Sequence, residues 1–389
     1  MTLKRILIGL AAILAAGLAV FFFVLPGYVE ANMNKVLQPP PYQASPQAAA
    51  LFKSLTVADL HADSLLWGRD LLQRATRGQV DVPRLIEGNV ALQVFAVVSK
   101  TPRGLNIEHN TADTDNVTLL ALGQRWPWRT LGSLKERALY QAARLHEMAE
   151  RSGGKLVIIK SRADLEALLE RRKSDPAIVG AVLALEGAQV LEGDPSNVDV
   201  MFDAGYRMMS PSHFFDTEMG GSAHGVEKGG LTEEGVDMIQ LMEEKRMIVD
   251  IAHASAATID DILELATRPV VVSHTGVRGT CDNNRNLSDE QLRRIAEQGG
   301  LIGIGFWDTA VCGADAKAIA AAQLYAAGVA GVDHIGLGSD FDGAVATPFD
   351  ATGLVEITDA LLGAGMAPGD IAKVMGANQI AFLLENLPQ

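Results

Sequence analysis

Charged and imidazole side chains stand at the ends of short apolar runs along this chain. Six such runs end in side chains that bind metals or transfer protons: His61, Asp63, Glu186, His213, His253, His274 and Asp340. Buried strands usually end in turn residues instead. In a (β/α)8 barrel the carboxyl ends of the strands meet at one mouth, where active sites lie. The pattern therefore predicts a closed barrel with a cluster of ligands at one end.

Eight strand-like runs alternate with helical patterns: residues 57–61, 90–98, 179–186, 207–213, 247–253, 270–274, 301–306 and 335–340. This alternation predicts parallel βα units rather than an antiparallel sandwich. Ligands on six separate runs favour an α/β fold of the (β/α)8 TIM type, because an open sheet places its site at one switch point. We expect the barrel to span residues 51–389, with an insertion at about 99–177, and the residues beyond 382 to fray.

The N-terminus carries a second strong pattern. Lys4 and Arg5 precede twenty uncharged, mostly apolar residues at 6–25, which is about the length of a membrane-spanning helix. We predict a transmembrane signal anchor at residues 6–26 and a stalk at 27–50. The two cations place residues 1–5 in the cytoplasm and the barrel outside it, on the periplasmic face of a bacterial inner membrane. A signal peptide cleaved near residues 15–19 is the alternative.

Composition excludes some function classes. The formal net charge of −14 disfavours a nucleic-acid surface, which is normally basic, and the chain has no Gly-x-Gly-x-x-Gly or Walker-type loop. Its two cysteines, Cys281 and Cys312, are candidates for a disulfide outside the cytoplasm. Two free buried thiols are the alternative, because sequence does not fix the geometry that a bridge requires.

The spacing of the ligand types suggests how they would share metal ions. His61 and Asp63 are two residues apart, so in an extended chain they point to the same side. Burying Glu186 at the end of an apolar strand is costly unless a cation pairs with it, and its two oxygens can bridge two ions. His253 and His274 end consecutive strands and can share the second ion. A single buried histidine is usually a hydrogen-bonded core residue, so the joint pattern predicts a two-metal hydrolase.

Several segments also resemble a known family. The segments DLHADSLLW, LALEGAQ, SPSHF, RPVVVSHTGVRGTCDNNRNLSDEQ and GVDHIGLGSDFDG are similar to the membrane dipeptidase (renal dipeptidase) family of zinc peptidases. The resemblance runs from about residue 57 to the C-terminus. It implies a metal-dependent barrel that cleaves free dipeptides through a metal-bridging hydroxide, in many members including dipeptides with D-configured C-terminal residues. It also implies two Zn²⁺ ions per chain.

The resemblance assigns roles to individual positions. It implies five zinc ligands, with Glu186 bridging the two ions: His61, Asp63, Glu186, His253 and His274. It places His213 beside the substrate carbonyl, where it binds substrate and stabilises the oxyanion, and Arg285 on the free carboxylate of the substrate. Asp340 would be the proton shuttle. Cys281 and Cys312 would occupy positions compatible with a bridge.

Two other functions stay open at this point. One is another binuclear barrel amidohydrolase or lactonase, and the other is a catalytically dead, membrane-tethered binding protein. Arg285 distinguishes a dipeptidase from a lactonase, because a lactone has no carboxylate for a guanidinium to bind. The expected partners are small dipeptide substrates and the membrane, through the N-terminal helix. Nucleic acid is not expected, and a homodimer stays open.

Overall fold

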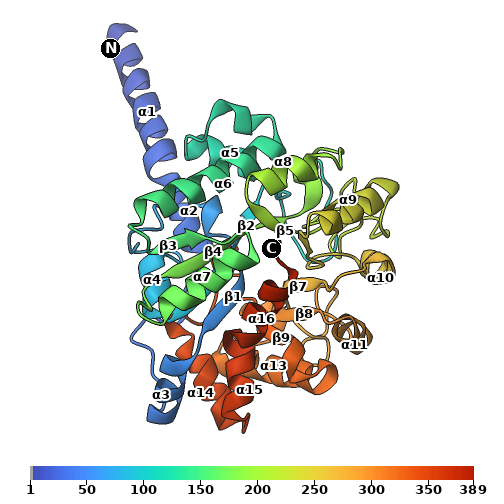
Figure 1. Ribbon diagram of the computed structural model, residues 1–389. Coiled ribbons are helices and arrows are strands. Elements are labelled where there is room, and N and C mark those ends of the chain that lie inside the picture. Colours follow the sequence, from blue (N-terminus) through green and yellow to red (C-terminus); the bar gives the residue numbers. More distant parts are fainter. Residues whose placement is uncertain (1–2) are drawn as a thin grey trace.

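The strands form a closed parallel ring in the computed structural model, which describes residues 3–389 (Figure 1). Within these residues the strands are β1 (Val57–Ala62), β2 (Val90–Val98), β3 (Leu156–Ile158), β4 (Val179–Glu186), β5 (Tyr206–Met209), β6 (Ile248–Val249), β7 (Val271–Thr275), β8 (Leu301–Ile304) and β9 (Ile335–Leu337). Their order is β6-β5-β4-β2-β1-β9-β8-β7. A parallel bridge between Asp250 and Val271 joins the two ends of this order. The predicted (β/α)8 TIM-type fold is therefore confirmed.

Several strands end earlier than we predicted. β5 stops at Met209 and β6 at Val249, each four residues before its histidine. β9 stops at Leu337, before Asp340. The reason is backbone conformation, because His253 has φ 63° and Asp340 has φ 59°, which lie outside the β region. These side chains therefore stand on loops at the barrel mouth rather than on the strands themselves.

The insertion is built into the barrel wall. It contains α5 (Val117–Gly123), α6 (Leu134–Arg151), β3 and α7 (Arg162–Arg172). β3 pairs with the first residues of β4, and β5 pairs with the later ones. β2 occupies the other edge of β4 from Gly180 to Glu186. β3 and β5 therefore share one edge, and the segment after β3 serves as the crossover to β4.

Helices surround the ring and cover its outer face. They are α4 (Val82–Glu87), α8 (Asn197–Asp203), α9 (Glu233–Glu244), α10 (Ala256–Leu265), α11 (Asp289–Glu297), α12 (Asp308–Val311), α13 (Ala316–Ala330), α14 (Val355–Gly363), α15 (Pro368–Ala372) and α16 (Asn378–Asn386). Thr232, Ser288 and Asp315 cap α9, α11 and α13 by accepting backbone N–H bonds, as expected of N-cap residues. β2 and β4 are buried at every position, which is typical of parallel strands covered on both faces.

The C-terminal residues are ordered, so the expected fraying beyond residue 382 is wrong. Leu383 and Leu387 are fully buried in a cluster that contains Leu60 and Leu92 of the barrel strands. The backbone N–H of Arg162 donates to the carbonyl oxygen of Pro388 at 2.7 Å. Burial of these leucines removes apolar surface from water, worth about 1.5–3 kcal/mol for each side chain. α16 therefore belongs to the barrel core.

The N-terminal region holds three helices: α1 (Leu3–Phe23), α2 (Leu25–Met33) and α3 (Pro46–Ser54). α1 projects away from the barrel (Figure 1) and has no buried residue, and its length and hydropathy suit a membrane span. Residues 27–50, which we expect to form a stalk, contact the barrel instead. Glu30 pairs with Arg69 and Arg77, and Val36 bridges Thr347. A buried ion pair and a backbone bridge thus hold this segment against the barrel mouth.

Candidate metal centre at the barrel mouth

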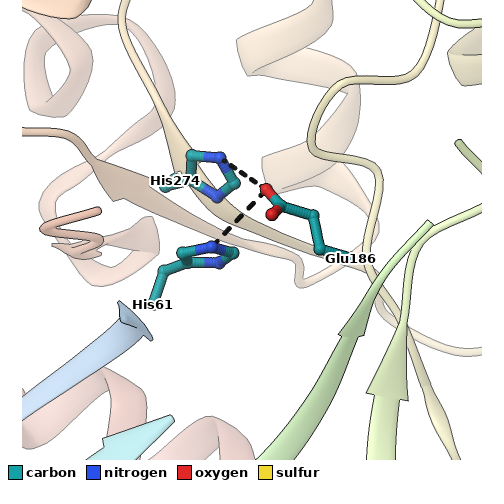
Figure 2. Close-up of side chains that lie close together, drawn as sticks. All are labelled: His61, Glu186 and His274. Carbon is teal, nitrogen blue, oxygen red and sulfur yellow. Dashed lines mark ion pairs between the residues drawn. The ribbon is translucent and has the colours of Figure 1, made fainter. Parts of the chain in front are cut away.

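Glu186, the last residue of β4, lies at the centre of the mouth. Its Oε1 is 3.1 Å from His253 Nε2 and 3.4 Å from His274 Nε2. Its Oε2 is 3.3 Å from His213 Nε2. Figure 2 shows the carboxylate facing the rings of both His61 and His274, and His61 Nε2 is 3.5 Å from Oε1. One carboxylate thus meets four imidazoles, which come from four different strands or the loops that follow them.

Asp63 and Asp340 complete the cluster on the side of β1 and β9. Asp63 Oδ2 lies 3.4 Å from His61 Nε2. Three overlapping groups keep their potential ligand atoms within 4.8 Å of one another: His61, Glu186 and His274; Glu186, His213 and His253; and His61, Asp63 and Asp340. The structure therefore brings together all seven side chains that the strand-end pattern singles out.

A serine that the sequence analysis does not single out orients two of the imidazoles. The hydroxyl of Ser273 lies 3.1 Å from His61 Nδ1 and 3.0 Å from His274 Nδ1. Both rings therefore turn their Nε2 atoms toward Glu186. Partners of this kind commonly fix the orientation of metal-binding histidines. The signal was present in the sequence, because Ser273 directly precedes His274 in VVVSH.

Burial sets the protonation of the histidines on one side of the cluster. Burial lowers the pKa values of His213, His253 and His274 well below their usual range, and nearby cationic groups lower them further. These rings are therefore neutral at pH 7, which is the form that binds metal ions. Neutral imidazoles can bind an ion without first releasing a proton.

The buried carboxylates of the cluster repel one another. Burial raises the pKa values of Glu186 and Asp340 well above their usual range, and the charge of Asp63 raises them further. Burial lowers the pKa of His61, but Asp63 and Glu186 outweigh this effect and raise it to about 10. Three carboxylates gathered in a buried site need positive charge beside them. A bound cation would supply more of it than one protonated histidine.

The donor atoms fit a divalent metal ion. His61 Nε2 and Asp63 Oδ1 are buried and have no hydrogen-bond partner, although buried polar atoms are nearly always paired. The donors are imidazole nitrogens and carboxylate oxygens, the types that bind zinc in catalytic sites. This cluster could therefore hold a metal centre.

Arg285 places a buried positive charge beside the cluster. Its Nη2 donates to the carbonyl oxygen of His274 at 2.7 Å, while its Nε is buried and unpartnered. Burial lowers the pKa of the guanidinium to about 10, so it stays charged at pH 7. The guanidinium carbon lies 5.8 Å from the centre of the Trp307 ring. A charged group with a free N–H here can receive an anion.

A disulfide and two asparagines hold the loop that carries Arg285. Cys281 and Cys312 are joined by a disulfide, which links this loop to the segment after β8. Asn286 donates to the carbonyl oxygens of Cys281 at 2.7 Å and Ala310 at 2.9 Å. Asn283 donates to the carbonyl oxygen of Thr309 at 2.8 Å. Arg285 therefore stands on a loop tied to its neighbour at several points.

A cavity of about 490 Å³ opens above the cluster. Its floor includes Glu186, His213 and Arg285, and its volume is within the usual range for small-molecule sites. His224, for which we predicted no role, also lines this cavity. Its Nδ1 lies 2.9 Å from the carbonyl oxygen of Ile107, and burial lowers its pKa to about 3. Its position in a glycine-rich loop was the available signal.

Other histidines lie outside the site. His109 is exposed, His146 contacts the carbonyl oxygen of Ala204 at 3.0 Å, and His334 contacts that of Gly300 at 2.8 Å. The chemistry is therefore concentrated at one mouth.

Comparisons with known proteins point in one direction. Residues 45–385 match the model of the membrane dipeptidase family, peptidase family M19. An uncharacterized protein in the pqqA 5′ region of Klebsiella pneumoniae is 29% identical over 260 residues, covering 62% of this chain and 93% of that protein. Dipeptidase aclJ of Aspergillus oryzae is 26% identical over 348 residues, covering 84% of this chain and 77% of the relative.

A solved structure has the same fold. A metallo peptidase from Rhodobacter sphaeroides, solved with a phosphinate mimic of the dipeptide L-Ala-D-Ala, superimposes with a TM-score of 0.68 at 22% identity. The match covers 86% of this chain and 99% of that chain. At this identity the likeness supports the barrel fold.

Proposed function

This chain belongs to the membrane dipeptidase family, peptidase family M19, and on that premise we propose that it hydrolyses the peptide bond of free dipeptides. The observation that carries the proposal is the pairing of two features in one cavity. A buried cluster of imidazoles and carboxylates lies beside Arg285, whose Nε has no partner. The cluster suits a metal-dependent hydrolase, and the guanidinium suits the carboxylate that every free dipeptide carries.

The proposed metal content is two Zn²⁺ ions per chain. His61, Asp63 and Glu186 would hold one ion, and Glu186, His253 and His274 the other. Glu186 Oε1 supports a bridging role, because it lies within 3.5 Å of Nε2 in His61, His253 and His274. When bound, such ions lower the pKa of a water and polarise a carbonyl oxygen.

Distance alone also groups His213 and Asp340 with the ligands. We assign both to the substrate instead, because the reaction needs two groups that are free to move protons or donate hydrogen bonds. Both line the cavity, as Asp63, Glu186 and His253 also do, so a substrate can reach them. This choice separates five ligands from two substrate-facing side chains. Metal content of variants at the two positions tests it.

The remaining side chains position the substrate and move its proton. His213, kept neutral by burial, would donate an N–H to the carbonyl oxygen as negative charge develops there. Burial raises the pKa of Asp340, so this carboxyl can hold a proton near neutral pH and deliver it to the departing amine. Arg285 would bind the free carboxylate and thereby set the register of the peptide bond.

We also propose that C-terminal residues of either configuration are accepted. The carboxylate is fixed at Arg285, while the side chain of the C-terminal residue faces a roomy cavity of about 490 Å³. Inverting the configuration moves that side chain but leaves the carboxylate and the amide in reach. A panel of L,L and L,D dipeptides measures this tolerance directly.

The test uses the purified full chain. Metal content by mass spectrometry should be about two zinc ions per chain, and L-Ala-L-Ala and L-Ala-D-Ala should release free alanine in a chelator-sensitive manner. Arg285→Ala should raise KM by more than about tenfold, as expected on losing a charge-assisted bond. Arg293→Ala is the control for loss of an arginine, because this exposed residue of α11 does not line the cavity. Bound zinc without dipeptide hydrolysis would favour another amidohydrolase or a lactonase. A protein without zinc would favour a catalytically dead binding protein.

The location of the enzyme follows from α1. We propose that α1 anchors the chain in the bacterial inner membrane with the barrel on the periplasmic face. Its length, hydropathy and exposure support this, and the disulfide suits an oxidising compartment. Fractionation with a periplasm-specific label on the barrel tests it, and light scattering tests whether two chains associate.

A further inference from the structure

One wall of the catalytic cavity comes from the N-terminal helices. The last turn of α1 and the inner face of α2 line it with apolar side chains: Phe21, Leu25, Val29 and Met33. Leu25 is 40% exposed and Met33 is 44% exposed, although both face the cavity. Covering this apolar surface with a ligand is favourable, because it removes the surface from water. These residues lie outside positions 45–385, the part that matches the family model.

The wall is fixed to the barrel. Glu30, which follows Val29 on α2, is 1% exposed and pairs with Arg69 at 2.5 Å and Arg77 at 2.6 Å. Asn34 Oδ1 accepts a hydrogen bond from the backbone N–H of Ala344 at 2.8 Å. α2 therefore has a set position over the mouth.

The wall stands across the mouth from Arg285. Val29 packs against a cluster that contains Trp67, which follows β1, and Val98 at the end of β2. Arg285 follows β7. In the ring order, with the ends joined at Asp250 and Val271, β2 is four strands from β7 in either direction. β2 and β7 are therefore diametrically opposed.

We propose that this wall selects dipeptides whose N-terminal residue has a bulky apolar side chain. The inference rests on the proposed function. With the carboxylate at Arg285 and the peptide bond over the Glu186 cluster, the N-terminal residue extends toward the opposite side, where Val29 and Met33 lie. Substrate binding then covers their apolar surface. N-terminal glycine leaves it uncovered, and the described residues of the N-terminal helices that line the wall offer no cation to an acidic side chain.

The test measures kcat/KM for Leu-Ala and Gly-Ala with the zinc-loaded full chain in lipid nanodiscs, which avoid free detergent in the cavity. The wild type should prefer Leu-Ala by at least about tenfold, as expected for burying a side chain of this size. In the double variant Val29→Ser/Met33→Ser this ratio should fall to about threefold or less, mostly through KM. Tyr28→Ser is the matched control, because Tyr28 lies on the outer face of α2 and is 64% exposed.

A charge variant keeps the test decisive if the serine variant folds poorly. Met33→Lys should raise kcat/KM for Asp-Ala relative to Leu-Ala by about tenfold, a gain that misfolding cannot produce. A wild-type ratio near one, or an unchanged ratio in both variants, overturns the inference and leaves the dipeptidase intact. An equal loss of kcat/KM for both substrates in both variants also overturns the inference, because the wall then has only a structural role. Failure of the zinc-loaded wild type on both dipeptides removes the proposed function and this inference with it.

Discussion

Replacing Glu30 with alanine should detach α2 from the barrel mouth while the barrel stays folded. Glu30 is 1% exposed, and its two carboxylate oxygens bind two arginines. Arg69 is buried, with a side chain that is 4% exposed, whereas the side chain of Arg77 is 35% exposed. The two ion pairs should therefore contribute unequally.

The cost comes mainly from Arg69. Removing one partner of a buried ion pair costs about 3–5 kcal/mol, because the other charge stays buried. Asp342 still contacts Arg69 in Glu30→Ala, so we expect a cost at the lower end of this range. The pair with Arg77 is screened by solvent and contributes about 0–1 kcal/mol. Glu30→Ala should thus weaken the docking of α2 by about 3 kcal/mol, and Arg77→Ala by less than about 1 kcal/mol.

Hydrogen exchange measures this docking directly, because each 1.4 kcal/mol is about a tenfold change in the opening equilibrium. The α2 amides should exchange about a hundredfold faster in Glu30→Ala, with little change in β2 and β4. Arg77→Ala is the control for charge loss at the same contact. Unchanged α2 exchange in Glu30→Ala, or an equal effect of Arg77→Ala, would refute the reasoning.

Three other changes test separate parts of the site. Asp340→Asn should keep both metal ions but lower kcat by about 10²–10⁴-fold, and mass spectrometry that finds less metal would make Asp340 a ligand. His224 has a pKa of about 3 in the folded chain and about 6.5 when unfolded. The contribution of its neutral ring to the free energy of unfolding is therefore fully present above pH 6.5 and is lost as the pH falls toward 3. Between pH 6.5 and 5 the wild type should lose about 2 kcal/mol more than His224→Gln in urea titrations; parallel curves would contradict this. Cys281→Ser/Cys312→Ser opens a loop with a sequence separation of 31 and should cost about 3–4 kcal/mol of unfolding free energy, and an unchanged urea midpoint would rule this out.

The ring and its cluster were predictable because both have local signals. β2 is an apolar run interrupted only by Gln93, β4 is an apolar run up to Glu186, and the predicted bounds of both agree with the structure. The histidines and carboxylates stand at run ends, and parallel topology brings such ends together. The strand ends were less predictable, because the positive φ of His253 and Asp340 depends on packing at the mouth rather than on residue type.

The contacts of α2 had no local signal. Glu30 is buried only because Arg69 and Arg77 lie beside it, 39 and 47 residues further along the chain. Composition alone suggested a spacer for residues 27–50, since prolines and polar residues are common there. Asp342, directly before Gly343, has the sequence context of a turn residue. In the structure it also accepts hydrogen bonds from Ser64 and from the backbone N–H of Gln79, which a turn motif does not reveal.

The side chains of the candidate site are spread along much of the chain, from His61 to Asp340, and this has a consequence for maturation. β1 and β9 are neighbours in the ring, yet Ser64 and Asp342, which are hydrogen-bonded beside the cluster, are 278 residues apart. A growing chain makes His61 early and Asp340 only near its end. The five proposed ligands are all present once His274 has been made, whereas the proposed proton shuttle, Asp340, follows β9, the last strand of the ring. No shorter nascent chain holds the whole site, so activity, rather than metal content, should report completed folding.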